Sequence, residues 1–181
     1  GNTGVSDAVG NAGIGTTDSN NYAVDTQRPT VLISVSDTSL IAGETSLVTI
    51  AFSEAVTGFD NADLTIANGT LSAVSTADGG VTWTATLTPT AELIDATNVI
   101  SLNVTGVSDA AGNAGVGTSN SSNYTINTVR PTAGIVVTDT SLIVGETSLV
   151  TITFSEAVTG FSNADLTIAS GTLSAVATTD G

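Results

Sequence analysis

Residues 45–59, TSLVTIAFSEAVTGF, return almost unchanged as residues 147–161, TSLVTITFSEAVTGF. Within this stretch Val48, Ile50 and Phe52 alternate with small or polar residues. Alternation of this kind predicts a β-strand that buries one face. The return of the whole stretch at a fixed offset predicts an array of repeated units.

The offset is 102 residues, as between Arg28-Pro29 and Arg130-Pro131. That period is the size of a domain, whereas the units of helical or leucine-rich solenoids are about 20–50 residues long. We therefore expect one complete domain, residues 27–128, with parts of its neighbours on both sides. Residues 1–26 match the C-terminal part of a preceding unit, and residues 129–181 match the N-terminal part of a following one. We expect such a chain to be a section of a longer polymer.

The complete unit is expected to be all-β. Alternating, β-branched segments predict seven strands, near residues 30–36, 45–53, 62–67, 70–76, 81–88, 97–105 and 121–127. Seven short strands with frequent turns are typical of an immunoglobulin-like (Ig-like) β-sandwich, so the chain reads as tandem Ig-like domains in a linear array. Trp83 is expected in the core. Asn68-Gly69 predicts a two-residue hairpin, and the Gly-, Ser- and Asn-rich residues 106–120 predict one long loop.

Composition excludes several classes of function. The chain has 17 acidic residues, two basic ones, no His and a net charge of −15. Nucleic acids and anionic membrane surfaces need cationic partners, so neither is expected as a ligand. The chain contains no run of 18 apolar residues, so we expect no membrane-spanning helix. Without His, Cys or Lys the usual nucleophile–base pairs lack a base, and we expect no enzyme.

The acidic residues fall where the loops of an Ig-like sandwich meet. At the end where the chain enters the domain we expect Asp25, Glu54, Asp60, Asp63, Asp109 and Asn113. Other acids fall at the opposite end, where Asn127 leads out, so acids of adjoining domains should face one another across each joint. Calcium takes six to eight oxygen ligands and would bridge them. The alternative is an acidic surface that keeps the chain soluble.

Two further observations favour calcium. Asp109 and Asn113 stand four residues apart with a Gly between them, and Asp7 and Asn11 repeat the pattern, so their oxygens can turn toward one point. Beaded surface proteins are also stiffened by disulfides or by Lys–Asn isopeptide bonds. The chain has no Cys and no Lys, which excludes both kinds of cross-link, so calcium is the stiffening agent that we expect.

The motifs TSLVTIAFSEAVTGF (45–59), ATNVI (96–100) and VSDAAGNAG (107–115) resemble the bacterial Ig-like tandem repeats of giant secreted adhesins, the biofilm-associated and RTX-type proteins. The resemblance covers the whole chain. It implies an extracellular or cell-surface stalk, export by a type I system and calcium-dependent rigidity. The positions that match the family's calcium motif are Glu54, Asp63, Asp109 and Asn113, with Glu156, Asp165, Asp7 and Asn11 in the flanking copies.

The copies differ at two of these places. Asp25-Thr26 before the first joint becomes Asn127-Thr128 before the second, which predicts weaker calcium binding there because Asn is uncharged. Asp60 becomes Ser162.

Three functions remain open from sequence. The first is an extender whose repeats adjoin end to end and are stiffened by calcium. The second is a fibre or sheath in which repeats also pack laterally, with the Thr82–Thr88 row as the candidate surface. The third is a module that binds a glycan or a protein through its loops. The similar loops of the two copies favour the extender.

Overall fold

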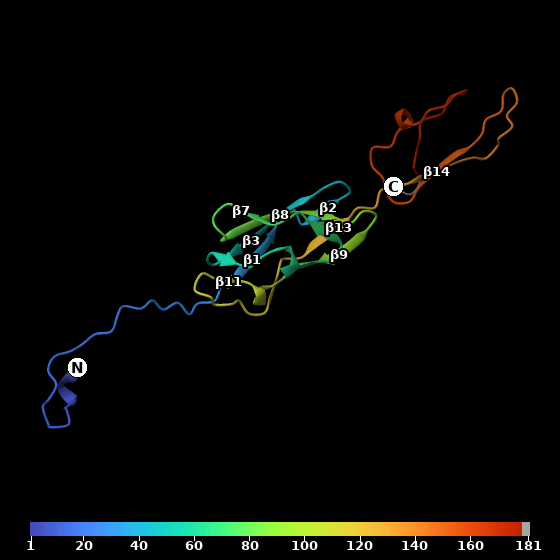
Figure 1. The fold of residues 1–181 in the computed structure, drawn as a ribbon. Helices are drawn as coiled ribbons and strands as arrows, with labels where there is room; N and C mark the ends of the chain where they lie inside the picture. Colours follow the sequence, from blue (N-terminus) through green and yellow to red (C-terminus); the bar gives the residue numbers. More distant parts are fainter. Residues whose placement is uncertain (179–181) are drawn as a thin grey trace.

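The computed structural model describes residues 1–178. A complete β-sandwich lies between two flanking segments that leave it at opposite ends (Figure 1). We call these the entry end, where residues 25–30 join the sandwich, and the exit end, where residues 127–132 leave it. The fold expectation is confirmed: the protein is all-β with Ig-like repeats.

The first layer of the sandwich is a sheet in the order β1-β3-β8-β6, with β7 also paired to β8. All of its pairs are antiparallel, and the register places Ile33 opposite Ile50 and Ile50 opposite Trp83. Its strands are β1 (Val31–Val35), β3 (Ser46–Phe52), β6 (Gly69–Leu71), β7 (Ser75–Thr76) and β8 (Thr82–Pro89). No residue in these five strands is charged.

The second layer consists of two three-stranded groups, β12-β10-β5 and β2-β13-β9. The chain crosses to this layer after β1, because β2 pairs in parallel with β13. The strands are β2 (Ser39–Ile41), β5 (Leu64–Ile66), β9 (Ile94–Asn98), β10 (Ile100–Asn103), β12 (Thr118–Asn120) and β13 (Tyr124–Asn127). At the entry end, β4 (Val56–Thr57) pairs with β11 (Ser108–Asp109) beside the 3₁₀ turns η2 (Asn61–Asp63) and η3 (Val104–Gly106).

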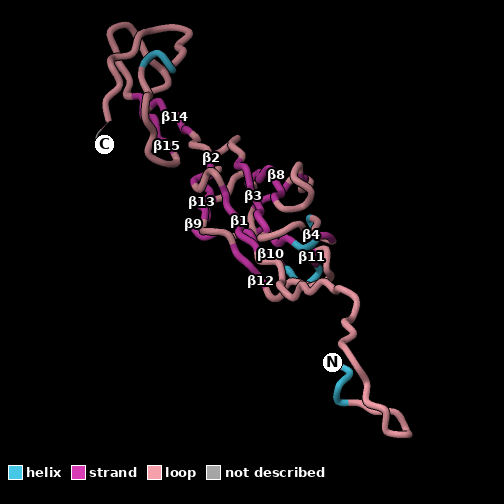
Figure 2. Tube along the Cα trace, turned by 90° about the vertical axis from the view of Figure 1, so that its left-hand side faces the viewer, coloured by secondary structure: helices cyan, strands magenta, loops and turns pink. Residues whose placement is uncertain are grey.

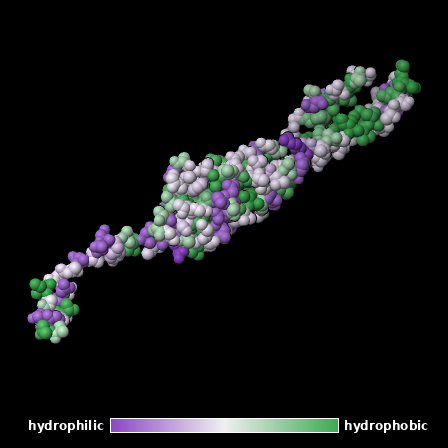
Figure 3. All heavy atoms as spheres, in the orientation of Figure 1, coloured by the Kyte–Doolittle hydropathy of each residue, from purple (hydrophilic) through white to green (hydrophobic). Residues whose placement is uncertain are grey.

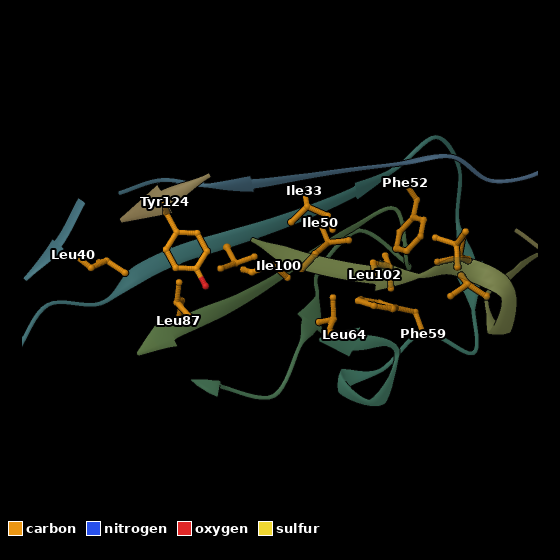
Figure 4. Packing of buried hydrophobic residues seen from close by; sticks show 14 of the residues in the cluster. Ile33, Leu40, Ile50, Phe52, Phe59, Leu64, Leu87, Ile100, Leu102 and Tyr124 are labelled. Atoms are coloured by element: carbon orange, nitrogen blue, oxygen red, sulfur yellow. The ribbon is translucent and has the colours of Figure 1, made fainter. Parts of the chain in front are cut away.

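One core fills the space between the layers (Figure 4). The alternation in β3 produces it directly, since Val48, Ile50 and Phe52 point inward and are almost fully buried. Trp83 packs against this core while half-buried, with its ring edge-on to Phe59 at a centroid distance of 5.2 Å. Among the described residues no buried side-chain polar atom lacks a hydrogen-bond partner. The buried residues of this core lie between Ile33 and Ile126 in the sequence.

Two local expectations were wrong. Asn68-Gly69 does not close a hairpin, because β5 pairs with β10 in one layer while β6 pairs with β8 in the other. Asn68 does take the left-handed conformation, with φ 58°, but its carboxamide is held by Asp95 and Asn98, and the chain changes layer there. Residues 106–120 are not one loop either, since β11 and β12 lie within them.

The flanking segments follow the local geometry of the complete domain. The C-terminal segment pairs β14 (Ala133–Val137) with β15 (Val150–Phe154) in the register of β1 and β3, and it includes η4 (Asn163–Asp165). The N-terminal segment contains η1 (Asn2–Gly4), a turn closed by a bridge between Ser6 and Ala12, and an extended run toward the entry end (Figure 2). Hydrophobic side chains lie open on the C-terminal segment, including Ile143 and Leu149 (Figure 3).

Candidate metal site at the entry end of the domain

Three carboxylates meet at the entry end of the complete domain. One oxygen from each of Asp25, Glu54 and Asp109 lies within 4.8 Å of the other two. Asp25 precedes the domain, Glu54 follows β3, and Asp109 is the last residue of β11. Asp109 is buried, Glu54 is half-buried and Asp25 is exposed. The group, which we call the entry cluster, thus joins the incoming chain to two loops of the domain.

Strand pairing places the two loops beside each other. β11 pairs with β4, and the register sets Asp109 opposite Val56, two residues after Glu54. The turn after Asp109 is tight, with the N–H of Gly112 donating to the carbonyl of Asp109 and Gly112 at φ +92°. A residue with a Cβ is disfavoured at that φ, which explains the Gly in this turn.

Asn113 holds the carboxylate of Asp109 in place. Its backbone N–H donates to Oδ1 and its carboxamide Nδ2 to Oδ2, both at 2.8 Å. The same Nδ2 donates to the backbone carbonyl of Asp25 at 3.2 Å. Asn113 was expected to offer an oxygen to the cluster. In the structure its carboxamide acts as a donor that ties Asp109 to the incoming chain.

The three carboxylates of the entry cluster repel one another. Desolvation raises the pKa of Glu54, and the negative charges of Asp109 and Asp25 raise it further. The hydrogen bond from the Asn113 carboxamide lowers the pKa of Asp109 and keeps that group ionised. Arg28, in the same joint, uses its Nη1 to donate to the carbonyl of Ala114 at 2.5 Å. The cluster therefore gathers negative charge that a cation would stabilise.

The donor set fits a hard divalent cation. Carboxylate oxygens can each bind in one- or two-oxygen mode, and Ca²⁺ accepts six to eight oxygens in flexible geometry. Zinc prefers nitrogen and sulfur ligands, and the chain has neither His nor Cys. Asp25, Glu54 and Asp109 are the residues that would hold such an ion.

Asp60 and Asp63 were expected in the same site and lie outside the entry cluster. They form a capping box at η2, in which Asp60 accepts from the N–H of Ala62 and Asp63 Oδ2 accepts from the N–H of Asp60 at 3.0 Å. Their spacing of three residues is typical of a capping box, so the sequence carried this signal.

The remaining predicted ligands lie in the flanking copies or at the second joint. Asp7 and Asn11 repeat the turn of Asp109 and Asn113, with Asn11 Nδ2 donating to Asp7 Oδ2 at 2.7 Å, and both are exposed. Asn127 and Glu156 occupy the positions of Asp25 and Glu54 at the second joint, and Asp165 caps η4 as Asp63 caps η2.

Sequence reasoning missed two contacts that fix the joints. Arg28 binds the carbonyl of Ala114, and a contact to a backbone group leaves no trace in side-chain patterns. Thr128, only 3 % exposed, is hydrogen-bonded to the loop between β8 and β9. The sequence did carry a signal for the Thr128 contact, because a Thr also stands before the first joint, at position 26.

Within residues 1–178, no helix is long and apolar enough to cross a membrane. Among curated proteins, none matches the chain. The family of the bacterial Ig-like domain matches residues 25–126 and again residues 127–181, each match beginning two residues before the domain boundary expected from the joints. With two consecutive matches that together span most of its length, the chain belongs to the bacterial Ig-like domain family.

Proposed function

We propose that this chain is an extender segment of a large bacterial surface adhesin, in which Ig-like domains in series are stiffened by Ca²⁺ bound at their joints. Domains of this family are structural, non-enzymatic modules and are typically extracellular or surface-exposed. The further assignment to an adhesin stalk exported by a type I system rests on the resemblance of the repeat motifs.

The entry cluster carries the proposal. Asp25 belongs to the incoming chain, while Glu54 and Asp109 belong to the domain, so an ion bound to all three fixes the direction from which the chain arrives. Asn113 already ties Asp109 to the backbone of Asp25, which limits how far the cluster has to rearrange. The ion would turn a repulsive joint into a rigid one.

Entry and exit at opposite ends make the domain suitable as a spacer (Figure 1). Each added repeat then lengthens the array by one domain, and the repeats adjoin end to end. The second joint has Asn127 where the first has Asp25, so it offers one carboxylate fewer and should bind calcium more weakly.

The full chain should be melted in EDTA and in millimolar CaCl₂. We expect calcium to raise the melting temperature and, in small-angle scattering, to narrow the spread of the maximum dimension. Glu54→Gln should remove both responses. Asp18→Asn is the control, because it removes one negative charge from an exposed position in the N-terminal segment, away from both joints. A wild-type protein with the same melting temperature and length in both buffers would contradict the proposal.

A lateral fibre or sheath is the second candidate, and one observation favours it. The sheet of β1, β3, β6, β7 and β8 has no charged residue, although the chain carries a net charge of −15. Two copies can approach through such a face without strong repulsion. Sedimentation of the wild type and of Thr84→Glu separates the two functions: a sheath requires association that this substitution abolishes, and an extender remains monomeric in both cases.

A further inference from the structure

A groove lies at the exit end of the domain, away from the entry cluster. Its walls are two turns, the one between β2 and β3 and the one between β8 and β9, and the last residue of the domain closes its base. The lining residues include Gly43, Glu44, Pro89, Glu92, Thr128 and Arg130. Arg130 lies two residues beyond the domain, in the joint to the following repeat, so the groove already contains a side chain from the next unit.

The turn from Ala42 to Glu44 lies beside this side chain. Gly43 has φ +90°, and a Cβ added to it would lie 3.9 Å from Nη2 of Arg130, in van der Waals contact. Glu44 is fixed in the same turn, because its Oε2 accepts a hydrogen bond from the N–H of Ile41 at 3.0 Å. One wall of the groove is therefore a held turn with a carboxylate and no intervening side chain.

The opposite wall holds a second carboxylate at a conformational cost. Glu92 has φ +53°, in the left-handed region that Gly or Asn occupies more readily than Glu. A non-glycine residue kept in this region is a reason to look for a function of its side chain. Glu92 lines the groove together with Glu44 and Arg130.

The base of the groove is rigid. The hydroxyl of Thr128 donates to the carbonyl of Thr90 at 2.7 Å and accepts from the N–H of Leu93 at 3.0 Å. The N–H of Thr128 also donates to the carbonyl of Leu93 at 2.8 Å. Only Val129 then separates this anchor from Arg130, so the position from which the arginine starts is fixed.

The equivalent arginine at the first joint turns the other way. Arg28 uses Nη1 to bind the carbonyl of Ala114 in the domain that follows it. Arg130 places Nη2 against the domain that precedes it. A guanidinium has five N–H donors in a rigid fork, so one arginine can serve both directions.

We propose that the exit groove is the docking site for the joint arginine, and that this arginine clamps consecutive domains by contacting the groove of the one before and the loop between β11 and β12 of the one after. The clamp rests on the serial arrangement in the proposed function but not on calcium. It would hold a joint partly ordered when no ion is bound.

The test measures the joint in EDTA, so that calcium plays no part. The chain has no Cys, so spin labels can be attached at Thr97→Cys in the domain and at Thr140→Cys beyond the joint, both exposed positions. We expect one narrow distance peak by pulsed electron paramagnetic resonance, and its loss in Arg130→Gln. Arg28→Gln is the matched control and should leave this distance unchanged.

Glu92→Gly separates a clamp from a structural role. It relieves the left-handed strain, so the melting temperature should stay the same or rise, while the distance peak broadens because the groove has lost a carboxylate. A narrow peak that survives in both Arg130→Gln and Glu92→Gly would overturn the clamp. The calcium response of the melting temperature is a separate measurement, so either proposal can fail alone.

Discussion

The carboxamide of Asn113 donates to Oδ2 of Asp109 at 2.8 Å, and this contact organises the entry end of the domain. It lowers the pKa of Asp109 and keeps a buried carboxylate charged. The same Nδ2 of Asn113 also donates to the backbone carbonyl of Asp25, so one donor binds both the domain and the incoming chain. These hydrogen bonds alone give the joint a framework.

Asn113→Ala should destabilise the complete domain. The substitution removes both side-chain hydrogen bonds and leaves Asp109, which is 4 % exposed, with backbone donors alone. A loss of this kind lowers the melting temperature of a domain of this size by several degrees. Asn11→Ala is the control, since it removes the same turn contact where the residues are exposed. Equal melting temperatures for the two variants would contradict the role of Asn113.

Glu54→Gln should stabilise the metal-free domain at neutral pH. The pKa of Glu54 is raised in the folded state by desolvation and by Asp109 and Asp25, so ionised Glu54 disfavours folding. For an acid with a raised folded pKa, stability is gained as the pH falls through that pKa. In EDTA the advantage of the variant should therefore be largest near pH 7 and shrink toward pH 4. Thermal melts across this range, with Glu156→Gln as control, check this prediction. A stability advantage of Glu54→Gln that grows on acidification would contradict it.

The strands could be predicted from sequence because alternation is a local property. Val48, Ile50 and Phe52 had to share a face in any strand, and that face became the core. The failure at Asn68-Gly69 has a long-range cause. The same left-handed residue serves a hairpin or a change of layer, and the choice is made by contacts with Asp95 and Asn98, about 30 residues away in sequence.

The entry cluster was predictable in part for the same reason. Loop positions in an Ig-like frame brought Asp25, Glu54 and Asp109 together, as expected, because strand pairing decides which loops meet. Asp60 belongs to a neighbouring loop, but its side chain is used by the local capping box. Which way Asn113 presents its carboxamide depends on atomic contacts that no spacing encodes.

Thr128→Val should cost about 1–3 kcal/mol of stability, because it leaves the N–H of Leu93 and the carbonyl of Thr90 without their buried partner. Valine keeps the shape, so the effect reports the hydroxyl. Urea unfolding of the full chain, followed by Trp83 fluorescence, measures it. Thr26→Val makes the same change at an exposed position and should be neutral. If both variants unfold at the same urea concentration, the anchor contributes nothing.

Asp78 should govern part of the acid sensitivity of the domain. The pKa of Asp78 is lowered from 3.8 to about 2 by the hydrogen bonds that its carboxylate accepts. The largest effect comes from Thr82, chiefly through its backbone N–H, and the hydroxyl of Thr76 adds to it. A carboxyl with a lowered folded pKa contributes stability that is complete above its unfolded pKa and is lost as the pH falls through the folded one. This contribution should therefore be present above pH 3.8 and disappear toward about pH 2.

Asp78→Asn should accordingly lower the melting temperature at neutral pH and make it less sensitive to acid, so that the curves of variant and wild type converge as the pH approaches 2. The site closes the turn between β7 and β8, where Oδ1 accepts from the N–H of Thr82 at 2.8 Å, so the loss is local to the first layer of the sandwich. Asp18→Asn removes the same charge from the exposed N-terminal segment and separates this effect from a change in net charge. Parallel curves for wild type and Asp78→Asn down to pH 2 would show that the turn carries no pH-dependent stability.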